Sequence, residues 1–94
     1  MSESDFEWDE ATAAANLARH GVSFEQARAA FGDPFAIDFV DDRHRYGEER
    51  LILFGMVDNR LLVVAHTWRG DKIRIISARE AEPHERRRYH EENS

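Results

Sequence analysis

Hydrophobic residues change their spacing near residue 35, and this change limits the folds that the chain can adopt. Before it, two segments carry apolar side chains at helical intervals. After it, four segments alternate apolar and polar residues, as strands with one buried face do. We expect strands at residues 35–41, 50–57, 61–68 and 72–78. The turns between the last three are short enough for hairpins, so these strands should form a four-stranded antiparallel meander.

Capping residues predict two helices ahead of the meander. The alanine-rich segment 10–20 lies between Asp9, which can cap its first turn, and Gly21, which fits the position after a helix. Ser23 and Gln26 form a capping box for the second helix, which should end at residues 32–34. A short strand or arm around Phe6 precedes them both.

A third helix is expected at residues 83–93, because proline is favoured at the first helical position and an acidic residue follows it. The whole order is a short N-terminal strand, two helices, the meander and a C-terminal helix. This order predicts the α+β class, and 94 residues fit a single domain over residues 1–94.

Composition excludes several classes of protein. No cysteine is present, so disulfide frameworks and thiolate metal sites are ruled out and a reducing compartment is expected. The acidic N-terminus lacks an apolar signal segment, and the apolar runs are too short to span a bilayer. We therefore expect a cytoplasmic protein with no membrane partner.

Charge is unevenly distributed along the chain. The net charge is -6, but residues 43–79 carry eight basic and four acidic side chains. Residues 1–42 carry two basic and ten acidic side chains, and residues 80–94 carry three and five. The basic island coincides with the predicted strands, so we expect a basic sheet that can hold a polyanion.

His66 is the one ionisable residue in the middle of an apolar predicted strand, on the same face as Leu62 and Val64. It is either a packed, hydrogen-bonded histidine or an acid–base group, since imidazole titrates near neutral pH. In the next strand, strict alternation places Arg74 on the face of Ala78, and Arg79 on the opposite face.

Arginines on neighbouring strands could grip one phosphate, because guanidinium binds it in a bidentate manner. The candidates are Arg50, Arg74 and Arg79; a solvated surface is the alternative. The charged loop at residues 41–50 could contact a phosphate backbone and stack a base, or be an ordinary hydrophilic hairpin. No histidine pair has metal-ligand spacing, so no metal and no cofactor are expected.

Several strings of residues are spread along most of the chain: Phe6-Glu7-Trp8-Asp9-Glu10-Ala11, Asn16 with His20-Gly21-Val22-Ser23-Phe24, Asp33-Pro34, His44 with Glu49-Arg50, Gly55, Arg74-Ile75-Ile76-Ser77-Ala78-Arg79 and Glu85-Arg86-Arg87-Arg88-Tyr89. In these strings and their order, the sequence resembles the BrnT family of toxins from bacterial type II toxin–antitoxin pairs. The resemblance implies a RelE-like fold and a metal-independent endoribonuclease that inhibits translation. It also implies a BrnA-type ribbon-helix-helix antitoxin as partner in a hetero-oligomer, with DNA bound only through that antitoxin.

The basic strands and the family resemblance together indicate one set of candidate residues for RNA cleavage through attack of the ribose 2′-OH. The catalytic candidates are His66, Arg50, Arg74, Arg79, Glu49 and His20. The RNA-binding candidates are Arg43, His44, Arg45, Arg69 and Lys72. The alternative is a non-catalytic module that binds an antitoxin, and a test of RNA cleavage would distinguish the two functions. Thr12 and Trp68 depart from the family pattern, so this alternative stays open.

Overall fold

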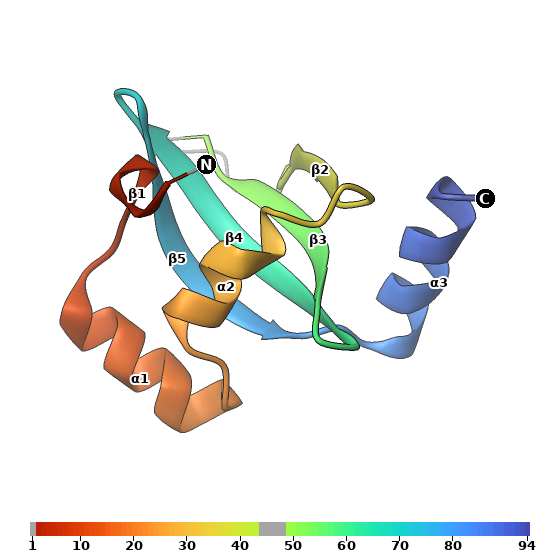
Figure 1. Cartoon of the computed structure of the whole chain (residues 1–94), viewed down its shortest axis with the longest axis horizontal. Helices are drawn as coiled ribbons and strands as arrows, with labels where there is room; N and C mark the ends of the chain where they lie inside the picture. The colour runs from red at the N-terminus through yellow and green to blue at the C-terminus, as the bar shows by residue number, and fades with distance from the viewer. Residues whose placement is uncertain (1, 44–48) are drawn as a thin grey trace.

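The computed structural model describes residues 2–43 and 49–94 and shows a five-stranded sheet with helices on both faces (Figure 1). Neighbouring strands from β2 to β5 run antiparallel, whereas β1 pairs parallel with β5. The α+β class is therefore confirmed, and the sheet is mixed. The elements are η1 (Glu3–Asp5), β1 (Phe6–Glu7), α1 (Glu10–His20), α2 (Phe24–Ala30), β2 (Ile37–Val40), β3 (Leu51–Val57), β4 (Arg60–Arg69), β5 (Lys72–Glu80) and α3 (Pro83–Glu92).

Helix α1 begins and ends, and helix α2 begins, at the residues that their capping signals predict. The Asp9 carboxylate accepts the backbone N–H of Thr12 at 2.8 Å, and Gly21 adopts a φ of 70° beyond the last turn of α1. The Ser23 hydroxyl and the Gln26 side chain form the reciprocal capping box of α2. Local hydrogen bonding therefore sets both ends of α1 and the start of α2, whereas α2 ends at Ala30, just before the stop expected at residues 32–34.

Helices α1 and α2 cover one face of the sheet and enclose the larger core cluster. Phe24 and Ala27 of α2 are fully buried against Leu62 and Val64 of β4. The buried Asn16 side chain ties α1 to β5, since its amide donates to the Ala78 carbonyl at 2.8 Å and its oxygen accepts the Ala78 N–H at 3.1 Å. These polar bonds fix the helix layer on the sheet.

Helix α3 packs against the opposite face, which we call the open face. Tyr89 of α3 is buried in a second cluster with Ile52, Phe54 and Leu61. Its hydroxyl donates a 2.6 Å hydrogen bond to Asp33, which also accepts the backbone N–H of Met56 at 2.8 Å. Desolvation and the bond to Asp33 raise the pKa of Tyr89 to about 12. None of the helices described is long and apolar enough to cross a membrane.

A bulge in β5 corrects the strand faces expected from strict alternation. Ala65 pairs with Ser77 whereas His66 pairs with Ile75, so Ile76 is an extra residue in β5. Beyond the bulge the alternation restarts in the opposite phase. Ala78 consequently joins the core under the helices, and Arg79 emerges on the open face together with Arg74.

Candidate active site

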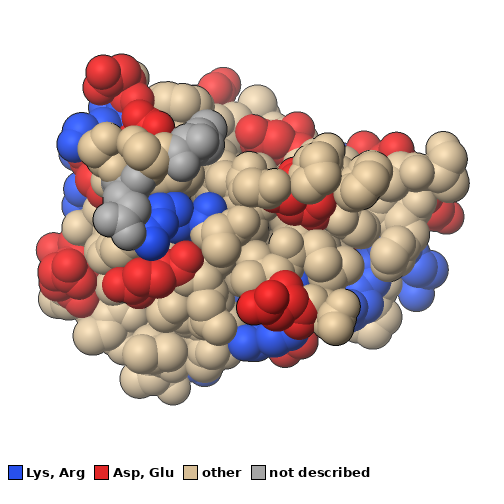
Figure 2. All heavy atoms as spheres, in the orientation of Figure 1, with Lys and Arg blue, Asp and Glu red and all other residues tan. Residues whose placement is uncertain are grey.

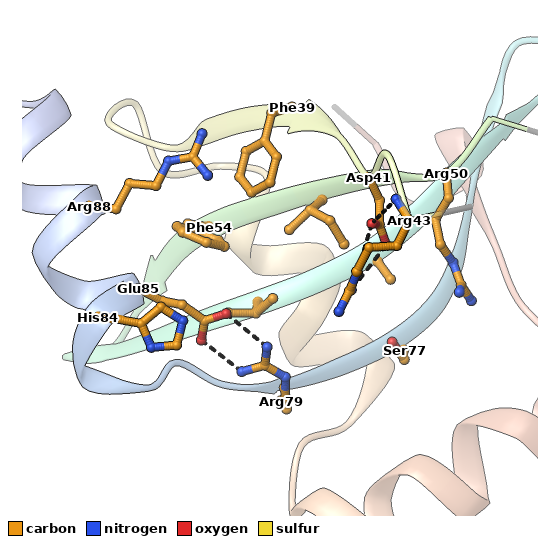
Figure 3. A pocket seen from close by; sticks show the side chains of 13 residues that line it. Phe39, Asp41, Arg43, Arg50, Phe54, Ser77, Arg79, His84, Glu85 and Arg88 are labelled. Carbon is orange, nitrogen blue, oxygen red and sulfur yellow. Dashed lines mark hydrogen bonds and ion pairs between the residues drawn. The ribbon is translucent and has the colours of Figure 1, made fainter. Parts of the chain in front are cut away.

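A pocket of about 300 Å³ lies on the open face, between the sheet and α3 (Figure 3). Its floor comes from the middle of the sheet and includes Val63 and Ala65 of β4. Its polar lining comes from segments far apart in the sequence: Arg43 after β2, Arg50 before β3, Ser77 and Arg79 of β5, and His84, Glu85 and Arg88 of α3. Arginine side chains therefore face this cavity from three sides.

Arg79 and Glu85 form a bidentate ion pair across the base of α3. The two guanidinium nitrogens of Arg79 donate to the two Glu85 oxygens, both at 2.8 Å. Glu85 also accepts the backbone N–H of Glu82 at 2.8 Å. Burial opposes the charged form of Glu85, but these bonds outweigh it and hold its pKa below the ordinary value. The hydrogen bonds to Glu85 raise the pKa of Arg79, so both groups are ionised at neutral pH.

Arg43 is held at the opposite side of the pocket by Asp41. Its Nε and Nη2 donate to the two Asp41 oxygens at 2.9 and 3.1 Å, and these bonds raise the pKa of Arg43. The Asp41 side chain is buried, whereas 79% of the Arg43 side chain is exposed. Asp41 also donates its backbone N–H to the carbonyl of Arg50 at 2.8 Å, which brings Arg43 and Arg50 to the same rim.

His84 is a pocket residue that the sequence analysis did not assign to the site. It follows Pro83 at the start of α3 and is exposed on the pocket wall next to Glu85 (Figure 3). Asp41, Ser77, Glu85 and Arg88 were missed as well. The proline that begins α3 directly after the basic strand was the one available signal, because it places residue 84 beside the end of β5.

The structure brings three of the predicted arginines together in the pocket and leaves Arg74 outside it. Arg43, Arg50 and Arg79 line the cavity. Arg74 lies on the open face towards β1, where its Nη1 donates to the Glu7 carboxylate at 3.0 Å. Its charge is therefore balanced at the edge of the sheet.

His66 lies on the face of the sheet covered by α1 and α2, away from the pocket. Only 1% of the residue is exposed, and its ring packs edge-on against Phe31 at 4.9 Å between centroids. Burial lowers the pKa of His66 despite a hydrogen bond with the Val64 carbonyl and the nearby Asp38, whose oxygen is 3.8 Å from Nε2. A neutral, packed imidazole is the form that this environment favours.

The remaining predicted residues lie outside the pocket or outside the described residues. Glu49 borders a separate groove of about 230 Å³ beside Thr67 and Trp68. His20 is exposed at the end of α1, in a shallow depression that Arg79 borders from its other side. Arg69 and Lys72 flank the exposed turn between β4 and β5, and His44 and Arg45 are outside the described residues.

Charge is mixed in sign on the face of the molecule that Figure 2 shows. On the face in Figure 2, among the residues coloured there, basic atoms lie in small groups next to acidic ones and no broad patch of one sign forms. Glu82, His84 and Glu85 place one possible metal-binding atom each within 4.8 Å of one another. Glu85 is already bound to the cationic Arg79, however, which disfavours a second cation at this position.

Comparison with known protein families gives a match over most of the chain. The model of a family described as the ribonuclease toxin BrnT of type II toxin–antitoxin systems matches residues 8–85. This range contains Arg43, Arg50, Arg79 and His84. No curated protein matches the chain.

Proposed function

Because this chain belongs to the BrnT family of ribonuclease toxins from type II toxin–antitoxin systems, we propose that it cleaves RNA in the pocket on the open face. The observation that carries the proposal is the convergence of Arg43, Arg50 and Arg79 beside His84 in one cavity. Guanidinium groups suit phosphate oxygens, and imidazole suits proton transfer near neutral pH. Both requirements of RNA cleavage are thus present in one place.

In the proposed reaction the ribose 2′-OH attacks the adjacent phosphorus and the 5′-oxygen leaves. His84 takes the 2′-OH proton, and water returns a proton to the departing 5′-oxygen. Arg50 and Arg79 stabilise the charge that grows on the non-bridging phosphate oxygens. The products are a 2′,3′-cyclic phosphate and a 5′-OH end.

Proton transfer is assigned to His84 instead of His66, which the sequence favoured. His66 is buried under the helices on the far face of the sheet, whereas His84 is exposed on the pocket wall. Glu85 is a poor base in this position, because its bonds to Arg79 lower its pKa. Glu49 and His20 border other depressions and are not proposed for the chemical step.

We propose that the reaction needs no metal. Arginine cations supply the positive charge that a divalent ion would otherwise provide, and the pairing of Glu85 with Arg79 disfavours an ion at residues 82–85. Cleavage in excess EDTA at the untreated rate is the expected result. Loss of cleavage in EDTA, restored by Mg²⁺, would contradict this part of the proposal.

As a toxin of the type II class, the protein has a protein antitoxin. We propose that this antitoxin is a BrnA-type ribbon-helix-helix protein that forms a hetero-oligomer with the toxin. The antitoxin then supplies the DNA contacts of the complex. A RelE-like relationship of the fold and a cytoplasmic location remain predictions. Induction of the toxin alone in a bacterium should slow growth and translation, and normal growth at high expression would contradict this.

The test of the function is cleavage of single-stranded RNA by purified protein, with analysis of the fragment ends. His84→Gln should lower the single-turnover rate about 100-fold or more, the usual scale of acid–base assistance. His90→Gln is the matched control, because His90 is an exposed histidine of the same helix that does not line the pocket. Intact RNA with wild-type protein would favour the non-catalytic binding module, and equal rates in both variants would remove His84 from the mechanism.

A further inference from the structure

One end of the pocket is aromatic, whereas the other holds Arg43 and Arg50, which the proposed function assigns to the phosphate (Figure 3). Phe39 of β2 and Phe54 of β3 meet edge to face, with their ring centroids 5.2 Å apart. The Arg88 guanidinium of α3 lies over the Phe39 ring at 4.0 Å and is 5.9 Å from the centre of Phe54. Arg43 and Arg50 lie at the far end of the same cavity (Figure 3).

The long side chain of Arg88 covers one face of Phe39. Phe54 is buried in the core, with 3% of its surface exposed, but Phe39 is half-buried on the edge strand β2. The Arg88 side chain is 47% exposed, and it also forms an ion pair with the equally exposed Glu92. Cation–π contacts and ion pairs at such exposed positions are weak, so a ligand that stacks better can displace the guanidinium.

We propose that this aromatic end binds one nucleobase of single-stranded RNA, stacked on Phe39, while the phosphate of the same strand lies among the arginines. The inference rests on the proposed function and specifies its substrate. Arg88 moves from Phe39 to the outer face of the base, where a guanidinium also stacks well. A paired base cannot offer its face in this way without unstacking, so the substrate is single-stranded and not duplex.

Stacking on a phenyl ring uses the face of the base and not its hydrogen-bonding edge. Every base has such a face, so this contact holds a nucleotide with little preference for its identity. The arginine end supplies charge and the aromatic end supplies apolar contact. The two contributions can therefore be separated by salt, because only phosphate contacts release counterions.

The experiment measures binding of a short single-stranded oligonucleotide that carries 2′-deoxy sugars and so cannot be cleaved by the proposed reaction. Phe39→Leu keeps apolar volume but removes the aromatic face, and Phe39→Trp restores it. Phe39→Leu should weaken binding roughly tenfold, Phe39→Trp should bind as wild type does, and the salt dependence should be the same in all three. Phe35→Leu is the control, because Phe35 is 60% exposed just before β2 and does not line the pocket.

An abasic version of the oligonucleotide should bind wild type and Phe39→Leu equally. Equal binding of the normal oligonucleotide to wild type and Phe39→Leu would overturn the proposal, as would Phe39→Trp binding no better than Phe39→Leu. The melting temperature of each variant shows whether it is folded. Failure of the proposed function gives a different pattern: RNA stays intact with wild type, whether or not Phe39 contributes to binding.

Discussion

Replacement of Arg79 by alanine should remove most of the activity and part of the stability. Arg79 gives both its terminal nitrogens to Glu85, so the variant loses two 2.8 Å hydrogen bonds and leaves a largely buried carboxylate without its cation. Removal of one positive group that stabilises the transition state should lower the cleavage rate about 100- to 1,000-fold, or ~2.7–4 kcal/mol.

The loss of stability follows from the burial of the two partners. Breaking a fully buried pair costs about 3–5 kcal/mol, whereas an exposed pair contributes little. Since 38% of the Arg79 side chain but only 11% of the Glu85 side chain is exposed, we expect an intermediate loss of about 1–3 kcal/mol. For a domain of this length that lowers the melting temperature by roughly 5–15 °C.

The pair also makes stability depend on pH. The folded-state pKa of Glu85 lies below its ordinary value of 4.5, so its contribution is complete above about pH 4.5 and is lost as the pH falls through the folded pKa. Arg79→Ala should reduce this acid sensitivity. Unfolding by denaturant at several pH values measures the difference directly.

Two variants separate the chemical role of Arg79 from its structural one. Arg79→Ala combined with Glu85→Gln should regain stability, because no buried charge is left, but should stay inactive. Arg60→Ala is the control, since Arg60 lies outside the pocket and pairs with the exposed Glu80 at the longer distance of 3.7 Å, so its loss should affect neither property. A double variant that regains activity, or equal small losses in Arg79→Ala and Arg60→Ala, would refute the reasoning.

Three further substitutions test the structure around the site. His66→Gln should lower the melting temperature yet leave the single-turnover rate per folded molecule unchanged. Burial lowers the pKa of His66, so wild type should lose stability below about pH 6.5, and the variant should not show this loss. Gly55→Ala should destabilise by about 1–3 kcal/mol in denaturant unfolding, because the new Cβ would lie 2.4 Å from the Ala30 carbonyl oxygen of α2. Tyr89→Phe should lower stability by about 0.5–1.5 kcal/mol or more, since it removes the 2.6 Å bond to Asp33 that holds α3 to the sheet.

Local signals predicted the helices of this fold well. Asp9 and Gly21 set the two ends of α1, and Ser23 and Gln26 set the start of α2, through hydrogen bonds within a few residues that can be inferred from sequence. Alternating hydrophobicity likewise indicated the strands, although β2 is four residues long where seven were expected. The parallel pairing of β1 with β5 joins distant segments, and no local pattern specifies it.

The bulge at Ile76 explains why the faces of β5 were misjudged. Strict alternation placed Arg74 and Arg79 on opposite faces, whereas one inserted residue reverses the phase between them. Nothing in the local sequence distinguishes this residue from its neighbours. The sequence nevertheless placed Arg79 near the end of the basic strand, and the structure places its side chain in the lining of the pocket.

His84 was missed because the pocket is completed by a helix that follows the sheet in sequence. Helix α3 packs against the open face, and its first two turns place residues 84, 85 and 88 in the lining of the pocket. Hydrophobic spacing indicates that a helix forms but not which strand it covers. The pocket therefore depends on tertiary packing: Arg43, Arg50 and Arg79 could be proposed from the charge pattern, whereas Arg88 of α3 could not.

The balance of charge around the pocket predicts how RNA binding should respond to salt. The chain carries a net charge of -6, and Arg43 and Arg79 already face Asp41 and Glu85. RNA must therefore compete with carboxylates for a small number of cations. For single strands the slope of log affinity against log salt is about -0.7 per phosphate neutralised, so contacts from two or three arginines give a slope of about -1 to -2. A slope steeper than about -4 would require more phosphate contacts than the few arginines of this pocket can make, and would contradict the prediction.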